Sequence, residues 1–269
     1  MTRPVSGLSG FQRGSDNRSG EKRAKQGTNM IHRLLIMFLI GLLPVTAWSA
    51  EGRGYFDFDG GYKTGDFGTA TKSNLYYFSP ALGFVTPRYE VSVTIPYLFL
   101  TNETAGQTAT EEGIGDIILR GGMVLLPETE NGFSLTGSVA VKVPTADEEE
   151  GLGTGETDYG GFLAVRKRIG PNRLTLSAGY IKVGSPSGAD LNDVYVYDVR
   201  YARMFTRTEL SAWYEGRRAL IPGAKNPQEI NVGFFHILNR DYSIKGSSFA
   251  GLNNGGPDFG LNLGMVRWF

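Results

Sequence analysis

Cysteine is absent from this chain of 269 residues, and histidine occurs only twice. Without thiols the protein can form neither disulfides nor thiolate-bound metal sites. The 27 basic and 27 acidic side chains cancel, so the charge balance does not indicate a nucleic-acid partner. Beyond residue 50, no stretch reaches the roughly 20 apolar residues that a membrane-spanning helix requires. These absences exclude a disulfide scaffold, a cysteine-bound zinc module and a helical membrane protein.

The chain is instead rich in glycine, with 38 residues, and 12% of its residues are aromatic. Its charge is unevenly distributed, because residues 1–50 hold seven basic and two acidic side chains and leave 20 basic and 25 acidic ones in the rest. An acidic chain rich in glycine and aromatic residues is typical of a β-barrel with a wet interior.

The first 50 residues resemble an export signal more than a folded domain. Residues 1–29 are rich in Ser, Gly and Arg and show no periodicity. Residues 30–50 hold basic residues, then the apolar run Leu34–Val45, then small residues, which is the order of a secretory signal peptide. A membrane anchor is the alternative, but the run is short and contains Pro44. We predict a non-structural extension over 1–29, a Sec signal peptide over 30–50 and one barrel domain over 51–269.

After residue 50, segments of alternating apolar and polar side chains are separated by turn residues. In the clearest segment, 133–144, every second residue is apolar or glycine and the residues between them are small or polar. Such alternation predicts strands with one apolar and one polar face. We predict an all-β fold, a closed antiparallel transmembrane barrel of about twelve strands, with ten or fourteen as alternatives. The strands are expected near 53–64, 73–86, 89–100, 114–126, 133–144, 159–169, 173–183, 192–205, 209–218, 229–238, 242–251 and 258–269.

Short turns alternate with longer connections along the chain. Bacterial outer-membrane barrels have this pattern, with short turns in the periplasm and long loops outside the cell. The long loops are expected near 65–72, 101–113, 145–158, 184–191, 219–228 and 252–257. Pro80 and Pro96 lie inside predicted strands, so either these strands have bulges or their predicted limits are displaced. The alternative fold is a soluble, many-stranded sandwich whose apolar face forms the core.

The final predicted strand, Leu261–Phe269, alternates apolar and polar residues up to its last residue. It resembles the closing strand of bacterial outer-membrane proteins, which commonly ends in Phe, although Arg267 departs from that pattern. A closed barrel has no exposed edge strand, whereas a soluble sheet ending this way invites aggregation. We therefore expect a place in the outer membrane of a Gram-negative bacterium, contact with lipid and lipopolysaccharide, and recognition of Phe269 by the barrel-assembly machinery.

If the apolar face meets lipid, the opposite face lines the lumen, and that face is rich in charges of both signs. Such charges predict cross-strand ion pairs that brace the wall, and a role in solute selectivity is the alternative. Tyr77, Lys63, Arg168, Glu229 and Lys245 share this face. The candidate solute-binding residues are Asp57, Asp59, Glu90, Asp116, Arg120, Lys142, Arg166, Asp198, Arg200, Trp213, Glu215 and Arg217.

One connection decides a pairing among these charges. A turn at Arg207-Thr208 sets Asp198 opposite Arg217, whereas a turn one residue earlier sets Asp198 opposite Glu215. Because like charges directly opposite one another are unfavourable, we predict the first register.

The predicted loop 145–158 is strongly acidic, which is common in a solvated loop but also suits cation binding. A divalent cation could bind there or bridge the loop to lipopolysaccharide, and the candidate ligands are Asp147, Glu148, Glu149, Glu150, Glu156 and Asp158. The glycines of this loop do not match a nucleotide-binding fingerprint.

The same region resembles a known family. The run Gly137–Gly160, in which Lys142-Val143-Pro144-Thr145 leads into the stretch 151–158, is similar to the bacterial MetA-pathway of phenol degradation family. The resemblance covers roughly residues 89–269 in pieces, which include Gly115-Asp116, Gly179-Tyr180, Val183-Gly184, Leu191–Val194, Tyr214–Arg217 and Gly256–Gly260. It implies an outer-membrane barrel of a type often described as a transporter, without catalytic residues.

An enzyme is not expected, because the predicted mature chain has a single histidine, His236, near a turn on the lipid-facing side. We expect neither a cofactor nor a metal, since no segment has calcium-loop spacing. The predicted function is a channel or transporter for small solutes, including hydrophobic or aromatic ones. The alternative is a non-transporting barrel whose acidic loops bind cations, lipopolysaccharide or a partner.

N-terminal sequencing of the exported protein tests the signal peptide. Cleavage is expected after Ala47, Ser49 or Ala50, where small residues follow the apolar run, and Met30 is then the expected initiator. A mature chain that still contains Leu34–Val45 would contradict this prediction.

Overall fold

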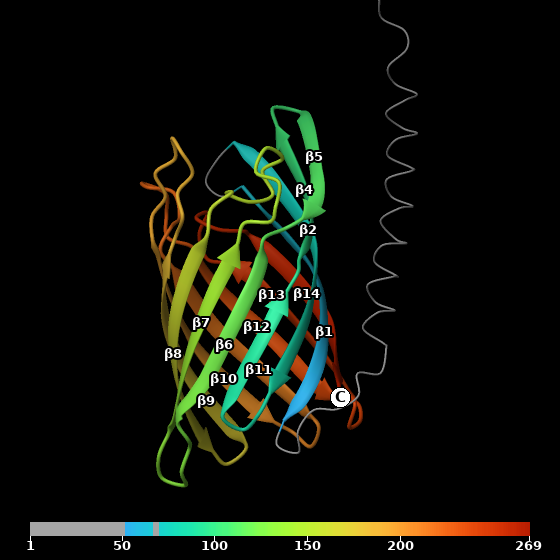
Figure 1. Ribbon diagram of the computed structural model, residues 1–269, viewed down its shortest axis with the longest axis vertical. Helices are drawn as coiled ribbons and strands as arrows, with labels where there is room; N and C mark the ends of the chain where they lie inside the picture. The colour runs from blue at the N-terminus through green and yellow to red at the C-terminus, as the bar shows by residue number, and fades with distance from the viewer. Residues whose placement is uncertain (1–51, 67–69) are drawn as a thin grey trace, which may run out of the picture. The chain divides into compact units, whose positions relative to one another are not determined.

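The computed structural model describes residues 52–66 and 70–269, so the segments predicted over 1–29 and 30–50 lie outside it. The described chain forms one antiparallel sheet that closes into a barrel (Figure 1). No helix in these two ranges is long and apolar enough to cross a membrane. The strands are β1 Arg53–Gly65, β2 Thr71–Val85, β3 Tyr89–Thr94, β4 Tyr97–Thr104, β5 Gln107–Ile114, β6 Ile117–Leu126, β7 Ser134–Val143, β8 Asp158–Ile169, β9 Asn172–Lys182, β10 Val194–Met204, β11 Thr208–Arg217, β12 Gln228–Ile237, β13 Tyr242–Gly251 and β14 Phe259–Trp268.

The barrel closes because β14 pairs with β1, from Tyr55 opposite Trp268 to Thr64 opposite Phe259. We use "stave" for one full crossing of the wall. β3 and β4 together form one stave along β2, and β5 and β6 form the next. The prediction of a closed antiparallel barrel of about twelve strands is confirmed, with twelve staves. Closure gives every stave a hydrogen-bonded neighbour on both sides.

The two ends of the barrel differ. Short turns join β2 to β3, β8 to β9, and β10 to β11 at the end that also holds the C-terminus (Figure 1). The opposite end carries the protruding β4–β5 hairpin and the longer connections. We call these the turn end and the loop end.

One predicted loop is wrong, because residues 101–113 mostly form the β4–β5 hairpin. Ala105 and Gly106 have φ values of 50° and 79°, which suits a tight two-residue hairpin turn. β-Branched threonines favour the extended backbone on both strands, and the Thr101 and Thr110 hydroxyl oxygens lie 3.3 Å apart across the ladder. The polar composition of this segment concealed its strands.

A bulge accompanies the two internal prolines. Pro96 lies in the gap between β3 and β4, where Thr94 pairs with Ile118 and Tyr97 pairs with Ile114. Three residues, 115–117, therefore face the two residues 95 and 96, and the additional residue lies at Gly115-Asp116. Pro80 lies across from the same break, where its carbonyl accepts the Ile95 N–H at 3.0 Å. The two prolines therefore place their missing donors at one interruption of the wall.

The outer face of the wall is apolar and the inner face is polar. Val139, Leu163 and Leu263 are 61%, 54% and 57% exposed, and they alternate along their strands with residues that point inward. Large exposed apolar surface over a whole barrel fits a wall that faces hydrocarbon.

The predicted register between β10 and β11 is wrong. Asp198 lies opposite Glu215, because the turn is centred one residue earlier than expected and Phe205 N–H donates to the Thr208 carbonyl. The two registers differ by two residues in pairing, so both keep the same side chains inside and the apolar pattern does not distinguish them. The charge of Glu215 is balanced along its own strand by Arg217, 3.3 Å away.

The assignment of the faces can be tested with Leu163→Arg. An arginine on the outer face near the bilayer midplane costs about 2–4 kcal/mol, so the unfolding free energy should fall by that amount. Denaturant unfolding in phospholipid vesicles measures it. Ser177→Arg is the control, because it places the same charge inside and opposite Asp198. Equal losses in the two variants would contradict the assigned faces.

Candidate functional site

Eleven of the twelve predicted lumenal residues lie on inward-facing positions of their strands, and Asp116 lies at the bulge between β5 and β6. The twelve do not form one site. Lys142 centres a network at the loop end, and Arg217 centres a second group nearby. Elsewhere on the inner face, Lys245 of β13 forms ion pairs with Asp57 and Asp59 of β1. Arginines dominate the turn-end part of β8, β9 and β10.

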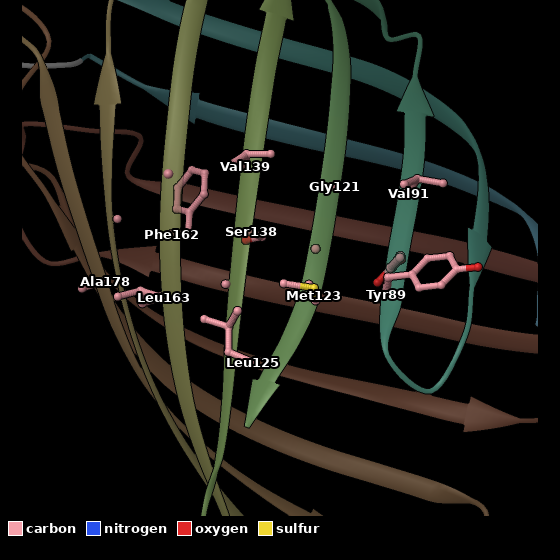
Figure 2. Close-up of a pocket in the computed structure, with 15 residues that line it drawn as sticks. Tyr89, Val91, Gly121, Met123, Leu125, Ser138, Val139, Phe162, Leu163 and Ala178 are labelled. Carbon is pink, nitrogen blue, oxygen red and sulfur yellow. The ribbon is translucent and has the colours of Figure 1, made fainter. Parts of the chain in front are cut away.

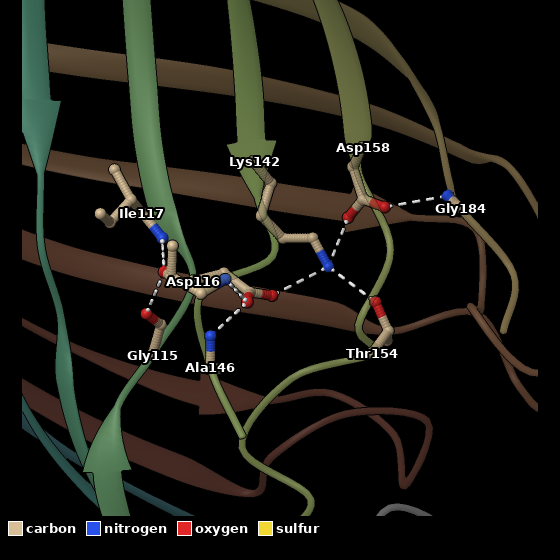
Figure 3. A network of polar contacts seen from close by, with 9 residues as sticks. Gly115, Asp116, Ile117, Lys142, Ala146, Thr154, Asp158 and Gly184 are labelled. Carbon is tan, nitrogen blue, oxygen red and sulfur yellow. Dashed lines mark hydrogen bonds and ion pairs between the residues drawn. The ribbon is translucent and has the colours of Figure 1, made fainter. Parts of the chain in front are cut away.

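Lys142, at the loop end of β7, joins two carboxylates and a hydroxyl (Figure 3). Its Nζ lies 3.0 Å from Asp116 Oδ2 and 3.2 Å from Asp158 Oδ2, and it donates to Thr154 Oγ1 at 2.9 Å. The three partners match the three donors of an ammonium group. Because the Asp116 side chain is only 9% exposed, loss of this ammonium would leave a nearly buried carboxylate without its cation.

This network ties three segments together. Asp116 leaves the wall at the bulge, and its Oδ1 accepts the N–H groups of Thr145 and Ala146 at 3.2 and 3.1 Å. On the other side, Asp158 Oδ1 accepts the Gly184 N–H at 2.9 Å. Lys142 therefore links the bulge to the β7–β8 loop and, through Asp158, to the β9–β10 loop.

The β7–β8 loop, residues 144–157, lies against the inner side of the wall. Leu152 is 7% exposed, and it contacts β5 at Gly113, where an added Cβ would lie 2.8 Å from Leu152 Cδ1. Gly113 is on the inward-facing register of β5, opposite Leu98. The loop is thus folded into the mouth of the barrel and narrows it.

The acidic residues of this loop have different surroundings. Asp147 Oδ1 accepts the N–H groups of Glu149 and Glu150 at 3.0 and 3.3 Å, and Glu148 is exposed like these two. Glu156 is half-buried, and Asp158 is engaged by Lys142. Within residues 52–66 and 70–269, no three His, Asp or Glu side chains are grouped to hold a metal ion. Cation binding by the loop stays a prediction.

Asp193 fixes the end of the β9–β10 loop. It accepts the Tyr180 hydroxyl at 2.5 Å and the Val183 N–H at 3.0 Å, and Lys182 Nζ lies 3.2 Å away. The hydrogen bond from Tyr180, followed by that from Val183, lowers the pKa of Asp193 below its usual value. This carboxylate therefore stays ionised and holds the loop at neutral pH.

Lys245 makes an ion pair that skips a strand. From β13 it reaches across β14 to Asp57 and Asp59 on β1, at 2.6 and 2.7 Å. It passes over Gly264 of β14, where a Cβ would collide with the Asp59 carboxylate and the stem of Lys245. The strongly curved inner face allows this contact only because the intervening residue has no side chain.

Arg173 and Glu209 repeat this arrangement on the opposite wall. They lie on β9 and β11, and their side chains meet at 2.5 Å across β10. The intervening residue is Ala202, which is 1% exposed beneath the pair. A small residue again lets two strands that are not neighbours share an ion pair.

Near the loop end, Arg217 Nη1 lies 3.3 Å from Glu215 and Nη2 lies 3.2 Å from Glu229. Lys63 is close by, with its Nζ 5.6 Å from the centre of the Tyr77 ring. Tyr77 therefore faces the lumen, as the alternation predicts.

A hollow of about 550 Å³ lies inside the barrel towards the turn end. Trp213 and Phe235 form its aromatic part, and Arg200 lies over the indole with its guanidinium carbon 4.0 Å from the ring centre. A second hollow of about 260 Å³ shares Arg173 and Glu209 with the first. Together they form a charged and aromatic space in the lumen.

Another hollow, of about 840 Å³, is on the wall rather than in the lumen. Gly121, Gly137 and Gly161 provide its shallow floor, and outward side chains such as Met123 and Leu163 surround it (Figure 2). Because these residues occupy lipid-facing positions, this groove is part of the outer surface and not of a solute path.

The sequence pattern does not identify Arg173 and Glu209 as candidates, and it places Asp158 among the cation ligands although Asp158 faces the lumen. Arg173 is two and four residues from Thr175 and Ser177, so the alternation of β9 indicates that it faces inward with them. The irregular alternation of this segment made its inward face less obvious than that of β7.

His236 lies on the outward-facing register of β12, and its Nδ1 is 2.7 Å from Thr208 Oγ1 near the turn end. This position agrees with the expectation from the sequence.

No family model and no curated protein matches this sequence. Solved structures do match. An outer membrane channel from Pseudomonas putida F1 is 16% identical with a TM-score of 0.67, and the alignment covers 84% of this chain and 100% of the channel. The KdgM porin is 9% identical with a TM-score of 0.50, covering 80% and 99%. The translocator domain of the autotransporter NalP from Neisseria meningitidis is 12% identical with a TM-score of 0.50, covering 93% and 98%.

The fold is that of a bacterial outer-membrane barrel. At these identities the likeness concerns the fold alone, and it includes a channel, a porin and a translocator domain. What this barrel does must therefore be argued from its own lumen.

Lys142→Met tests the loop-end network. Losing the charged hydrogen bonds to Asp116 and Asp158 should cost about 1.5 kcal/mol or more of local stability, so loop 144–157 should open about tenfold more often. Limited proteolysis with a glutamate-specific protease, which can cut at Glu148–Glu150, measures this opening.

Lys182→Met is the matched control, since Lys182 is a lysine at the same end whose side chain is 66% exposed. In the Lys182→Met variant, loop 144–157 should be cut at the wild-type rate. Equal cleavage of the wild-type protein and the Lys142→Met variant would show that Lys142 does not hold the loop.

Proposed function

We propose that this barrel is a channel that passes small solutes across the outer membrane. The observation that carries the proposal is the inner hollow of about 550 Å³, which lies within a closed wall and is lined by charged, polar and aromatic side chains. A barrel that served only as a scaffold would gain stability from a filled interior without such a hollow. The channel and porin folds among the similar structures support the same function.

We also propose membership of the MetA-pathway of phenol degradation family. The segments that carry this resemblance meet in the structure: Asp116, Lys142, Thr154, Asp158 and Gly184 all belong to the loop-end network (Figure 3). Their shared role in anchoring the loop gives a physical reason for such a pattern to recur in one family.

Small aromatic solutes are the class that the lumen fits best. Trp213 presents an indole to the inner hollow, and Tyr77 lies on the inner face nearer the loop end. A ring can stack on such side chains, while a wide, fully polar pore would favour sugars or ions. Loop 144–157 narrows the mouth and sets an upper size limit.

The remaining expectations concern partners and chemistry. We infer that the barrel contacts lipid and lipopolysaccharide, and that Phe269, whose N–H donates to the Gly54 carbonyl at 2.9 Å, is recognised by the barrel-assembly machinery. We infer no enzymatic activity, because His236 faces outward near the turn end and not into the lumen. Export by a signal peptide belongs to the same proposal.

Solute flux into proteoliposomes tests the channel. Vesicles containing the barrel should admit arabinose and small aromatic alcohols faster than protein-free vesicles, with rates that fall as solute size rises. Cells with and without the protein should differ in the same order for aromatic compounds of graded polarity.

A matched pair of variants locates the path. Ser247→Trp adds an indole to the inner hollow and should reduce flux severalfold, whereas Ser248→Trp adds the same group to the outer face and should leave flux unchanged. Flux equal to that of empty vesicles for the wild-type protein would instead favour a non-transporting barrel that acts through its acidic loop.

A further inference from the structure

Four arginines gather on the inner wall where β8, β9 and β10 approach the turn end. Arg168 lies directly opposite Arg173 across the β8–β9 ladder. Arg166 and Arg200 both lie opposite Thr175, one from each side of β9. The four arginines thus lie around one threonine on three adjacent strands.

Few carboxylates pair directly with this cluster. Of the four arginines, only Arg173 has an ion pair among the residues that the structure describes, with Glu209. Glu128 accepts the backbone N–H of Arg168 and lies near Arg166, and Asp198 and Glu215 lie near Arg200. In the described ranges, none of these three carboxylates forms an ion pair with an arginine of the cluster. Like charges facing one another across a ladder are destabilising, so a cluster of this kind fits a site whose negative charge comes from a ligand.

Arg200 is already held in the geometry of a receptor. Its guanidinium stacks on Trp213 at 4.0 Å, and no described side chain forms an ion pair with it. A stacked guanidinium keeps its N–H edge free and presents a planar fork that suits a carboxylate. Trp213 and Arg200 both line the inner hollow, so an aromatic ring and a carboxylate can be bound there side by side.

One more donor lies beside this ring. Asn231, directly opposite Trp213 on β12, is 6% exposed, and its Nδ2 is buried without a hydrogen-bond partner. A buried donor of this kind is unfavourable unless something accepts its hydrogen bond.

We propose that the arginine cluster binds the carboxylate of a small aromatic acid, with the ring of the acid lying in the hollow against Trp213. This inference rests on the proposed channel function and narrows it to aromatic carboxylates. Arg166 and Arg200 bind the carboxylate, Arg168 and Arg173 add positive potential, and the Arg173–Glu209 pair separates the two hollows. The opposite wall, where Asp57 and Asp59 exceed the single charge of Lys245, repels the anion towards the arginines.

Isothermal titration of the intact barrel in detergent tests the site with benzoate, benzyl alcohol, acetate and inorganic phosphate. Benzoate should bind at least about tenfold more tightly than benzyl alcohol, because benzyl alcohol lacks the carboxylate that accepts charged hydrogen bonds from the arginines. It should also bind more tightly than acetate and phosphate, which have no ring.

The double variant Arg166→Gln/Arg200→Gln should weaken benzoate by about tenfold or more and remove its advantage over benzyl alcohol. Trp213→Leu should remove the advantage of benzoate over acetate. Arg207→Gln removes an exposed arginine from a turn at the same end and should bind benzoate as the wild-type protein does. Heat-modifiable gel mobility verifies that each variant is a folded barrel.

Equal affinity for benzoate and benzyl alcohol, or an unchanged affinity in the folded double variant, would overturn the proposal. Phosphate binding as tightly as benzoate would overturn the aromatic class. The channel is tested separately. Flux without a preference for benzoate would contradict this binding site and support the channel. Benzoate binding without flux would support the site and contradict the channel.

Discussion

The structure depends on the pairing of β14 with β1. That ladder closes the sheet, so the backbone groups of every stave bond within the wall and the outer face can be apolar from end to end. Closure also forces the inner faces of twelve staves around a narrow space. Charged side chains from strands that are not neighbours are thereby brought within reach of one another, as the pairs over Gly264 and Ala202 show.

The interruption of the wall at Pro96 has a consequence far from its own strands. Two prolines concentrate their missing donors at a single bulge, and the additional residue turns Asp116 towards Lys142 and the loop that follows β7. The loop is then held against the inner wall by Leu152 and Thr154. The bulge that interrupts the hydrogen bonding of the wall thus also anchors the loop at the mouth of the barrel.

The charges of the lumen balance in number but not in place. Near the loop end, Lys142 and Arg217 each have two carboxylate partners. At the turn end of β8–β10 the arginines outnumber the carboxylates that reach them. Ion pairs that brace the wall and a surface for binding therefore occupy different depths of the same lumen. The loop-end charges have the structural role, and the turn-end arginines have the proposed role in selectivity.

The sequence by itself determined the barrel, the side each residue faces and nearly all strand positions, because a two-residue alternation survives whatever the strands pair with. It also indicated an irregularity near Pro80 and Pro96, since proline lacks a donor wherever it stands, but not the extra residue on the facing strand. Only the tertiary structure decided the β10–β11 register, because a shift of two residues leaves every side chain on its face. It alone revealed the β4–β5 hairpin, whose strands extend the wall without an apolar face, and the pairs that cross an intervening strand. Those pairs depend on the curvature of the closed wall, which no local pattern contains.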